Sequence, residues 1–506
     1  MPAEALRTNL VALLLLSAGL IFLIGPANPR TSVASTSVWV RKGAKVNALR
    51  KKPQEKPYRI TQTLFDGFLK YQTYKFQTVV YGSPEELEGG FVFGPGHHTA
   101  AMAGLLFNGE NKPLVVLKTG DLRFTRLERG EPYKLDGCVA GRMDKMGAST
   151  IDIALAELAE EVGGEVVGSS FRPLGKELTP TMPLESTECD TYFVAAVRVL
   201  SKPSGDGGKM EVPELIGAKV VSPSEAWKLF SGGRVSDGAR TQVMFGRAFD
   251  SIGYVPTHDL FVQDFPELAG RFQTLGLGET WDPRLENLES EVPPAPKDDN
   301  NPMSRINSAQ AVERRTVPLP SGEMVDAEIR HAIKTGDTLT PVGNTFSSQF
   351  LKLEYDRVKV AEYYQDPESG PMVKMKTRIR PVMAFAPGKP RTYRLDVDDL
   401  PVPRNENFLE KMENTITLGS PSGASSGQSD LYYHYAATEV KKPEKPTGEG
   451  FVTLGEAIRL CRSGHGDAQT EALLLRLAHH LKWNPNLSMS WEDLKRVTAL
   501  TSGPEE

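Results

Sequence analysis

The chain of 506 residues is poor in cysteine, carries no excess of basic charge, and has its one long apolar run near the N-terminus. Its three cysteines, Cys138, Cys189 and Cys461, are few and far apart, which argues against both a disulfide scaffold and a cysteine-based zinc site. The formal net charge of −5 does not suit a nucleic-acid-binding surface, so we expect no nucleic-acid partner. Hydrophobic residues make up 39% and charged residues 24%, which excludes a wholly disordered chain and a multi-span transporter. At roughly 150 residues per domain, the length predicts about two to four domains.

The apolar run, Leu10–Ile24, is interrupted only by Ser17 and Gly19, and no charged residue occurs between residues 8 and 29. It is long for the core of a signal peptide (about 7–15 residues) and short for a spanning helix (roughly 20), so a cleaved signal stays the alternative. Nine Lys or Arg residues and one Glu follow between residues 30 and 59. Because positive charge collects on the cytoplasmic side, we predict a membrane anchor over residues 1–29 and a basic juxtamembrane segment over 30–57. The body then faces the cytosol, or its equivalent at an organellar membrane.

The rest of the chain divides into two halves around a polar segment. Residues 276–325 include the Pro-rich stretch Glu291–Pro302, which has no hydrophobic periodicity, and we predict a linker there. The flanking domains then span residues 58–275 and 326–506, and both alternate strand-like and helix-like segments.

Five short matches occur in the same order in the two halves, which argues for an internal duplication. The matched pairs are 68–70 with 350–352, 132–136 with 392–396, 190–196 with 430–437, 225–229 with 456–460, and 237–241 with 467–470. We therefore predict that the second half repeats the strand order of the first. The helix that should follow Leu395-Asp396 is expected to be altered or missing.

One segment of the first half combines several helix signals. Ser149 or Thr150 can cap a helix that runs to about Val162, where Gly163 and Gly164 end it. Helical spacing predicts one apolar stripe that faces the sheet, formed by Ile151, Leu155, Leu158 and Val162.

Three carboxylates share one face of the same predicted helix. Glu157, Glu160 and Glu161 stand at i, i+3 and i+4, and they repel one another unless a cation lies among them. Hard oxygen ligands of this kind suit Mg²⁺ or Mn²⁺. The alternative is a solvated acidic helix face.

These residues resemble the box of the Nudix hydrolases, G-x5-E-x7-R-E-U-x-E-E-x-G-U, in which U is a bulky apolar residue. Glu157–Gly163 matches the second half of the box, and Ala140-Gly141 matches the turn that precedes it in the ADP-sugar branch of the family. The sequence departs from the box at Ala148, where the first Glu is expected, and at Ala156, where the Arg is expected. One residue is also inserted between the turn and Ala148.

The resemblance implies a set of metal ligands and a catalytic base. The loop over residues 179–190 resembles the loop of ADP-ribose pyrophosphatases that supplies a late catalytic Glu; Glu188 fits best and Glu185 second, and an ordinary acidic surface loop is the alternative. Glu161 is the other candidate base. The implied ligands of Mg²⁺ or Mn²⁺ are Glu157, Glu160, Glu161 and the carbonyl of Ala140.

The resemblance covers about residues 58–255 and implies the α/β (α+β) fold class. It predicts tandem Nudix-type α/β/α sandwiches, the second copy degenerate, after an N-terminal transmembrane helix. In the second half, Asp396, Asp398 and Asp399 stand where the box should begin, and we interpret them as a polar turn rather than a cation site.

Two functions stay open at this point. The first is a membrane-anchored hydrolase that uses Mg²⁺ or Mn²⁺ to cleave the pyrophosphate of a nucleoside diphosphate derivative, most naturally an ADP-sugar. The second is a catalytically weak or inactive pseudo-Nudix protein that binds or scaffolds at a membrane. In either case the expected assembly is a homodimer or an intramolecular pseudo-dimer.

Overall fold

The computed structural model describes residues 58–66, 70–80, 83–93, 98–119, 135–143, 148–181, 187–199, 218–235, 238–286, 306–318, 324–336, 345–352, 356–386, 393–402, 414–423, 432–443 and 450–501. Among the helices in these ranges, none is long and apolar enough to cross a membrane. The predicted anchor Leu10–Ile24 and the basic segment 30–57 lie outside the described residues.

The first half begins with an antiparallel sheet of β1 (Tyr58–Asp66), β2 (Lys70–Val80) and β3 (Ser83–Phe93). A mixed sheet follows, with its main strands in the order β10-β11-β4-β5-β12. At its centre β4 runs parallel to β11, whereas β5 and β7 pair with β4 in the antiparallel sense. The strands of this sheet are β4 (His98–Phe107), β5 (Pro113–Thr119), β6 (Leu135–Gly137), β7 (Val139–Arg142), β8 (Gly164–Val166), β9 (Arg172–Pro173), β10 (Thr179–Pro180), β11 (Cys189–Val199) and β12 (Ala218–Val221).

Helices cover both faces of this mixed sheet. One face packs on α3 through Ile153, Leu158 and Val162, and the other packs on α5 through Val243 and Phe245. The helical and terminal elements are α3 (Thr150–Val162), α4 (Pro223–Ser231), α5 (Gly238–Ser251), the hairpin β13 (Tyr254–Val255) and β14 (Leu260–Phe261), η1 (Val262–Asp264), α6 (Pro266–Ala269) and η2 (Pro283–Glu286).

The second half follows a similar order of elements, without a counterpart of α3 among its described residues; residues 403–413, where we predicted an altered or missing helix, lie outside the described residues. It begins with an antiparallel sheet of β15 (Ile306–Pro318), β16 (Met324–Gly336) and β17 (Thr345–Lys352). Its mixed sheet has the main order β20-β19-β18-β24-β22. The remaining elements are β18 (Asp356–Asp366), β19 (Gly370–Ile379), η5 (Pro381–Phe385), β20 (Tyr393–Asp396), β21 (Asp398–Val402), β22 (Thr415–Thr417), β23 (Ser422–Gly423), β24 (Tyr432–Glu439), β25 (Gly450–Thr453), α7 (Leu454–Leu460), η7 (Cys461–His465), α8 (Ala468–His480), β26 (Trp483–Asn484), β27 (Met489–Ser490) and α9 (Trp491–Thr501).

The strand pairings of the two mixed sheets correspond one to one at their centres. β18 runs parallel to β24 and antiparallel to β19 and β21, as β4 does to β11, β5 and β7. β20 and β25 pair with β19, as β6 and β12 pair with β5. Four of the five sequence matches fall on equivalent elements, whereas Lys70 begins β2 and Lys352 ends β17. The mixed α/β class predicted from the sequence is confirmed.

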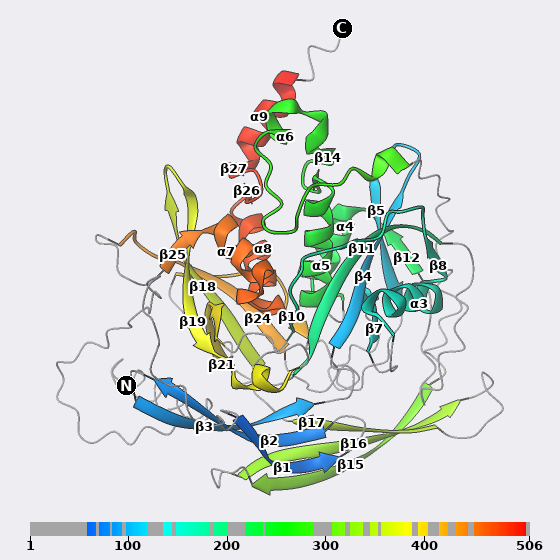
Figure 1. Cartoon of the computed structure of the whole chain (residues 1–506), viewed down its shortest axis with the longest axis vertical. Coiled ribbons are helices and arrows are strands. Elements are labelled where there is room, and N and C mark those ends of the chain that lie inside the picture. Colours follow the sequence, from blue (N-terminus) through cyan, green and yellow to red (C-terminus); the bar gives the residue numbers. More distant parts are fainter. Residues whose placement is uncertain are drawn as a thin grey trace, which may run out of the picture.

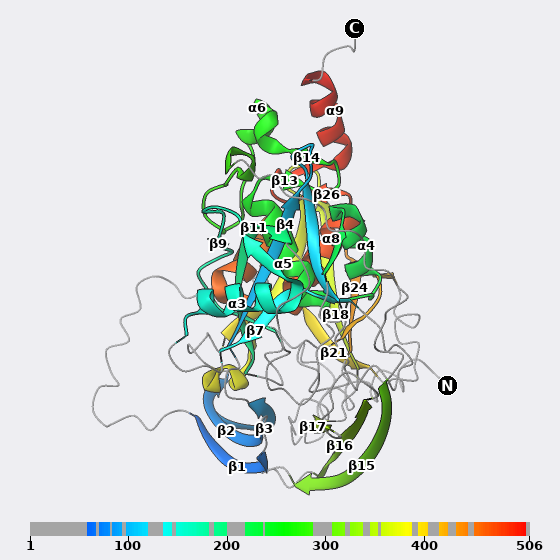
Figure 2. The ribbon, with the colours of Figure 1, turned by 90° about the vertical axis from the view of Figure 1, so that its right-hand side faces the viewer.

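The two halves pack on each other through helices. α5 and α8 lie side by side between the two mixed sheets, and α3 covers the outer face of the first sheet (Figure 1). The sheets β1–β3 and β15–β17 lie together at the end of the molecule opposite to α6 and α9 (Figures 1 and 2). One apolar core joins the halves, since Phe245 of α5 and Leu474 of α8 belong to the same buried cluster.

The contact between α5 and α8 is reciprocal. Arg247 follows Thr241 by six residues, and Arg476 follows Thr470 by six, so the two arginines are equivalent positions. Arg247 binds Glu471, with Nη2 2.5 Å from Oε2, and Arg476 binds Gln242, with Nε 2.9 Å from Oε1. Because Gln242 and Glu471 each follow the matched threonine, the same pair of positions meets twice across the interface. This is the pattern of an isologous, twofold-related contact.

One domain boundary differs from the sequence prediction. β15 falls inside the segment 276–325, which we predicted to be a linker, and it pairs with β16 along its whole length, from Ile306 opposite Gly336 to Pro318 opposite Met324. The prediction relied on hydrophobic periodicity, whereas this strand is defined by its backbone pairing. The linker prediction was wrong for residues 306–318.

Candidate functional site

The helix α3 begins and ends where the sequence predicts. The Ser149 hydroxyl accepts a hydrogen bond from the Asp152 amide at 3.1 Å, and the Asp152 carboxylate accepts one from the Ser149 amide at 3.0 Å, which forms a capping box. Gly163 ends the helix in the left-handed conformation, with φ +65°, which favours glycine. The cap and the glycine therefore fix the length of α3 and the position of its glutamates.

The face that α3 turns to the sheet differs from the predicted stripe. Leu158 and Val162 are buried as expected, but Ile151 is 45% exposed and Leu155 is 38% exposed. Ile153 and Ala154 fill the interface instead, and Glu161 lies in it with only 2% of its surface exposed. The predicted stripe was wrong at Ile151 and Leu155, because α3 is rotated so that a carboxylate faces inward.

The buried Glu161 carboxylate is paired with a lysine of the sheet. Lys118, near the end of β5, places its ammonium nitrogen on Oε1 of Glu161, and the two side chains are 6% and 3% exposed. Oε2 of Glu161 accepts a hydrogen bond from the Ala140 amide at 3.2 Å. Glu161 therefore meets the N–H of Ala140, the residue whose carbonyl we predicted as a metal ligand. An ammonium group supplies the positive charge at this position.

The other two box glutamates lie farther out. A Cβ placed on Gly141 would lie 2.3 Å from Cγ and Oε1 of Glu157, so this side chain lies against the bare backbone of strand β7 at Gly141. Because glycine has no Cβ, Gly141 leaves the space that the Glu157 side chain occupies, and a larger residue would collide with it. Glu160 is partly exposed. The structure thus brings Glu157 and Glu161 to Ala140 and Gly141, which lie within strand β7 and do not form the predicted turn.

The loop glutamate Glu188 is buried and paired with an arginine. The guanidinium of Arg240, in the first turn of α5, binds Glu188 and also binds Asp190, with Nε 2.8 Å from Oδ2. Tyr192 donates its hydroxyl to Asp190 at 3.0 Å. Burial raises the pKa of Asp190 to about 6 against the opposing effect of Arg240. Glu185, the second candidate, lies outside the described residues.

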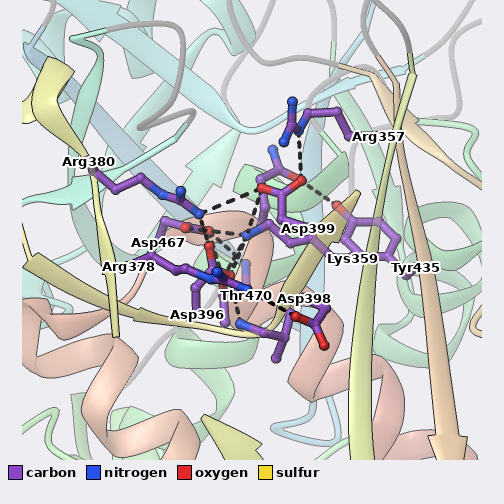
Figure 3. A network of polar contacts seen from close by, with 12 residues as sticks. Arg357, Lys359, Arg378, Arg380, Asp396, Asp398, Asp399, Tyr435, Asp467 and Thr470 are labelled. Carbon is purple, nitrogen blue, oxygen red and sulfur yellow. Dashed lines mark hydrogen bonds and ion pairs between the residues drawn. The ribbon is translucent and has the colours of Figure 1, made fainter. Parts of the chain in front are cut away.

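The second half holds a denser buried network where β18, β20 and the start of α8 meet, shown in Figure 3. Lys359 of β18 lies 2.7 Å from Oδ1 of Asp396, 3.5 Å from Oδ2 of Asp467 and 3.0 Å from the Thr470 hydroxyl. Arg380 binds the other oxygen of Asp396. Burial opposes the charge on Lys359, but the neighbouring carboxylates outweigh it and raise its pKa. Lys359 and Arg380 likewise hold the pKa of Asp396 below its usual value, although burial would raise it.

This network corrects the interpretation of the second-half aspartates. We predicted a polar turn for Asp396, Asp398 and Asp399, but Asp396 is fully buried and Asp399 is 6% exposed on its side chain. Only Asp398 has the expected character, on the sheet surface beside Lys376 and Arg378. Each mixed sheet therefore carries a buried lysine, and each lysine binds buried carboxylate.

The sequence analysis did not identify Lys118 and Lys359 as the partners of the buried carboxylates. Lys118 ends the otherwise apolar run Pro113–Lys118, and a lysine inside a buried strand is the signal that could have pointed to an internal counter-ion. Within the described part of the chain, no group of three or more His, Cys, Asp or Glu residues is placed to hold a metal ion. Comparison with protein-family models finds no match, and comparison with curated proteins also finds none.

Proposed function

We propose that this protein is a pseudo-Nudix scaffold, held at a membrane by its N-terminal segment, whose first-half site does not carry out hydrolysis. The observation that carries the proposal is the buried ion pair between Lys118 and Glu161. A Nudix-type reaction needs Glu161 as a metal ligand or a base. A carboxylate bound to an ammonium group in a dry interface is poorly suited to either role.

The negative charge of the second candidate base, Glu188, is also neutralised by a buried cation. Glu188 is 2% exposed, and its carboxylate binds Arg240, which also binds Asp190. A base must reach the water that it activates, and Glu188 faces an arginine instead. The Ala148 and Ala156 departures from the box point in the same direction.

The scaffold part of the proposal rests on the relation between the halves. The repeated strand pairings and the reciprocal contacts of Arg247 and Arg476 support two Nudix-like copies joined as an intramolecular pseudo-dimer. The apolar run Leu10–Ile24 and the basic residues after it support attachment to a membrane, with the body on the cytosolic side.

A Nudix-type hydrolase acting on an ADP-sugar is the second candidate. The position of Glu157 against Gly141 of β7 and the partial exposure of Glu160 favour it, because carboxylate oxygens can recruit Mg²⁺ or Mn²⁺. In that case slow turnover is expected, since Glu161 is paired with Lys118.

A combined binding and turnover experiment separates the two candidates. Mn²⁺ binding to the full chain is measured by electron paramagnetic resonance. Hydrolysis of ADP-ribose in Mg²⁺ or Mn²⁺ is followed by chromatographic detection of AMP. The scaffold proposal expects neither tight Mn²⁺ binding nor turnover. Turnover that disappears in a Glu161→Gln variant with an unchanged circular dichroism spectrum, but persists in the control Glu165→Gln, whose side chain is exposed on β8, would establish the hydrolase instead.

A further inference from the structure

Two buried carboxylates of the first half meet at one guanidinium nitrogen. Nη2 of Arg240 binds Oε1 of Glu188, and the same nitrogen lies 2.9 Å from Oδ1 of Asp190. Glu188 is 2% exposed and Asp190 is completely buried, so bulk water screens neither negative charge. Because both oxygens bind one atom, the two carboxylates are close neighbours in a dry part of the molecule.

The charges of these three groups do not balance when both carboxylates are ionised. Arg240 carries one positive charge, whereas Glu188 and Asp190 together carry two negative charges. When two carboxylates share a buried site, the pKa of one of them rises and the pair retains one proton. Burial is the largest cause that raises the pKa of Asp190 to about 6, and the charge of Glu188 adds to it against the effect of Arg240. Such a pair titrates as a unit, so the proton belongs to both residues.

The other polar groups around Asp190 come from its own strand, from the neighbouring strands and from α5. Tyr192 of β11 donates its hydroxyl to Oδ2 of Asp190 at 3.0 Å, and burial raises the pKa of Tyr192, so this donor stays neutral. The threonines that pair with Asp190 on β4 and β10 are uncharged. Arg142 lies on β7, one strand beyond β4. The guanidinium of Arg247, farther along α5, lies 5.0 Å from the centre of the Tyr192 ring.

The pair connects the mixed sheet to the helix of the half–half interface. Asp190 is the second residue of β11, and Arg240 lies in the first turn of α5. The same helix contacts α8 of the second half through Arg247, which binds Glu471. A change in the charge of the pair therefore acts on the start of the helix that carries this contact.

We infer that Glu188 and Asp190 form a proton-binding pair, and that their shared proton determines how firmly the start of α5 is held to the sheet. With one proton, the pair carries a single negative charge, which Arg240 balances. When that proton is released to solvent, two carboxylates repel each other at one nitrogen, and the contact between β11 and α5 weakens. The inference goes beyond the proposed function, since it holds whether or not the first-half site hydrolyses a substrate.

Infrared spectroscopy of the full chain tests the shared proton directly. A protonated carboxyl group has a C=O stretching band that its ionised form lacks, and ordinary carboxyls lose it at about pH 4. We expect a part of this band to persist in the unmodified chain and to disappear as the pH rises through about 6. Both Glu188→Gln and Asp190→Asn should lack that part, because each leaves one carboxylate for one guanidinium. The control Glu165→Gln removes an exposed carboxylate and should retain it.

The same proton predicts how stability depends on pH. Unfolded carboxyls have a pKa of about 4, so the native pair binds more protons than the unfolded chain between that value and about 6. Its contribution to stability is then present at the lower pH and lost as the pH rises through the raised pKa. The melting temperature of Glu188→Gln should therefore rise relative to that of the unmodified chain between about pH 5 and pH 8. A pair that is fully ionised throughout this range predicts the same deficit for the variant at every pH.

Hydrogen exchange tests the effect of the proton on α5. Residues 238–242, at the start of this helix, are followed by mass spectrometry at the same two pH values, with rates corrected for the intrinsic effect of pH. In the unmodified chain we expect exchange there to be about threefold faster or more at the higher pH, because the local contact opens more easily. Neither Glu188→Gln nor the reference helix α3 should show this difference.

Three results would overturn the inference. The first is a carboxylic acid band that neither substitution at Glu188 or Asp190 changes. The second is a melting temperature of Glu188→Gln that differs from that of the unmodified chain by the same amount at each pH. The third is equal exchange at residues 238–242 at the two pH values, which would remove the link to α5. If Asp190→Asn does not fold, Glu188→Gln decides alone. Binding of Mn²⁺ or turnover of ADP-ribose by the unmodified chain would refute the proposed function and leave these results untouched.

Discussion

Replacing Lys118 by methionine should destabilise the first half strongly, because it removes the charge that Glu161 faces. The side chains of Lys118 and Glu161 are 6% and 3% exposed, so water cannot take the place of the ammonium group. Removing one partner of a buried ion pair costs about 3–5 kcal/mol, and methionine keeps a similar length, so packing loss adds little. Chemical denaturation followed by circular dichroism, read at neutral pH, gives the change.

A second substitution separates charge from packing. In Lys118→Met/Glu161→Gln the buried charge is gone, and a glutamine oxygen can still accept the Ala140 amide, so most of the lost stability should return. The reasoning is refuted if Lys118→Met costs less than about 1 kcal/mol, or if the double variant is no more stable than the single one.

Three further outcomes follow from the structure. Glu471→Gln should cost about 3–5 kcal/mol and split the unfolding transition, because Arg247 binds Glu471 across the half–half interface and Arg462 binds it within the second half. Differential scanning calorimetry measures this, with the exposed Glu492→Gln as control, and a single unchanged transition contradicts it. Burial, and then the neighbouring His480, lower the pKa of His479, so its contribution to stability is present above its ordinary pKa and lost as the pH falls through the lowered value. The melting temperature should therefore drop on acidification to about pH 5, less so in His479→Phe, and equal slopes for the two proteins would count against this. If Leu10–Ile24 anchors the chain with its body in the cytosol, added protease should digest the region after residue 58 on intact vesicles, and protection of that region would reverse the orientation.

Local signals in the sequence were sufficient for the bounds of α3. Ser149 and Gly163 act on the backbone next to them, so their effect does not depend on the rest of the fold. The orientation of the helix depends on a residue far away in the chain. Lys118 precedes Glu161 by 43 residues, and its ammonium group turns the carboxylate inward and leaves Ile151 and Leu155 exposed. Hydrophobic periodicity considers only the spacing of apolar residues within the helix, so it could not predict the effect of a distant charged partner such as Lys118.

The same limit applies to the second half. The matched segments predicted where β20, β24, α7 and α8 occur, because a repeat preserves local pattern. The buried network could not be predicted, since Lys359, Asp396 and Asp467 come from three separate elements and only the tertiary fold brings them together. The acidic character of Asp396 and Asp399 suggested exposure to solvent. Three cations neutralise them in the structure, Lys359 and Arg380 at Asp396 and Arg357 at Asp399.

The reciprocal meeting of α5 and α8 has a consequence for how this interface can change. In a homodimer, any substitution near a twofold axis occurs twice, so a new charge must tolerate its own copy. Here the two copies are encoded separately, and they already differ, since Gln242 faces Arg476 where Glu471 faces Arg247. Each side can therefore acquire a residue that would be unacceptable if both sides had to carry it. Covalent linkage has made the two sides of one contact independently variable.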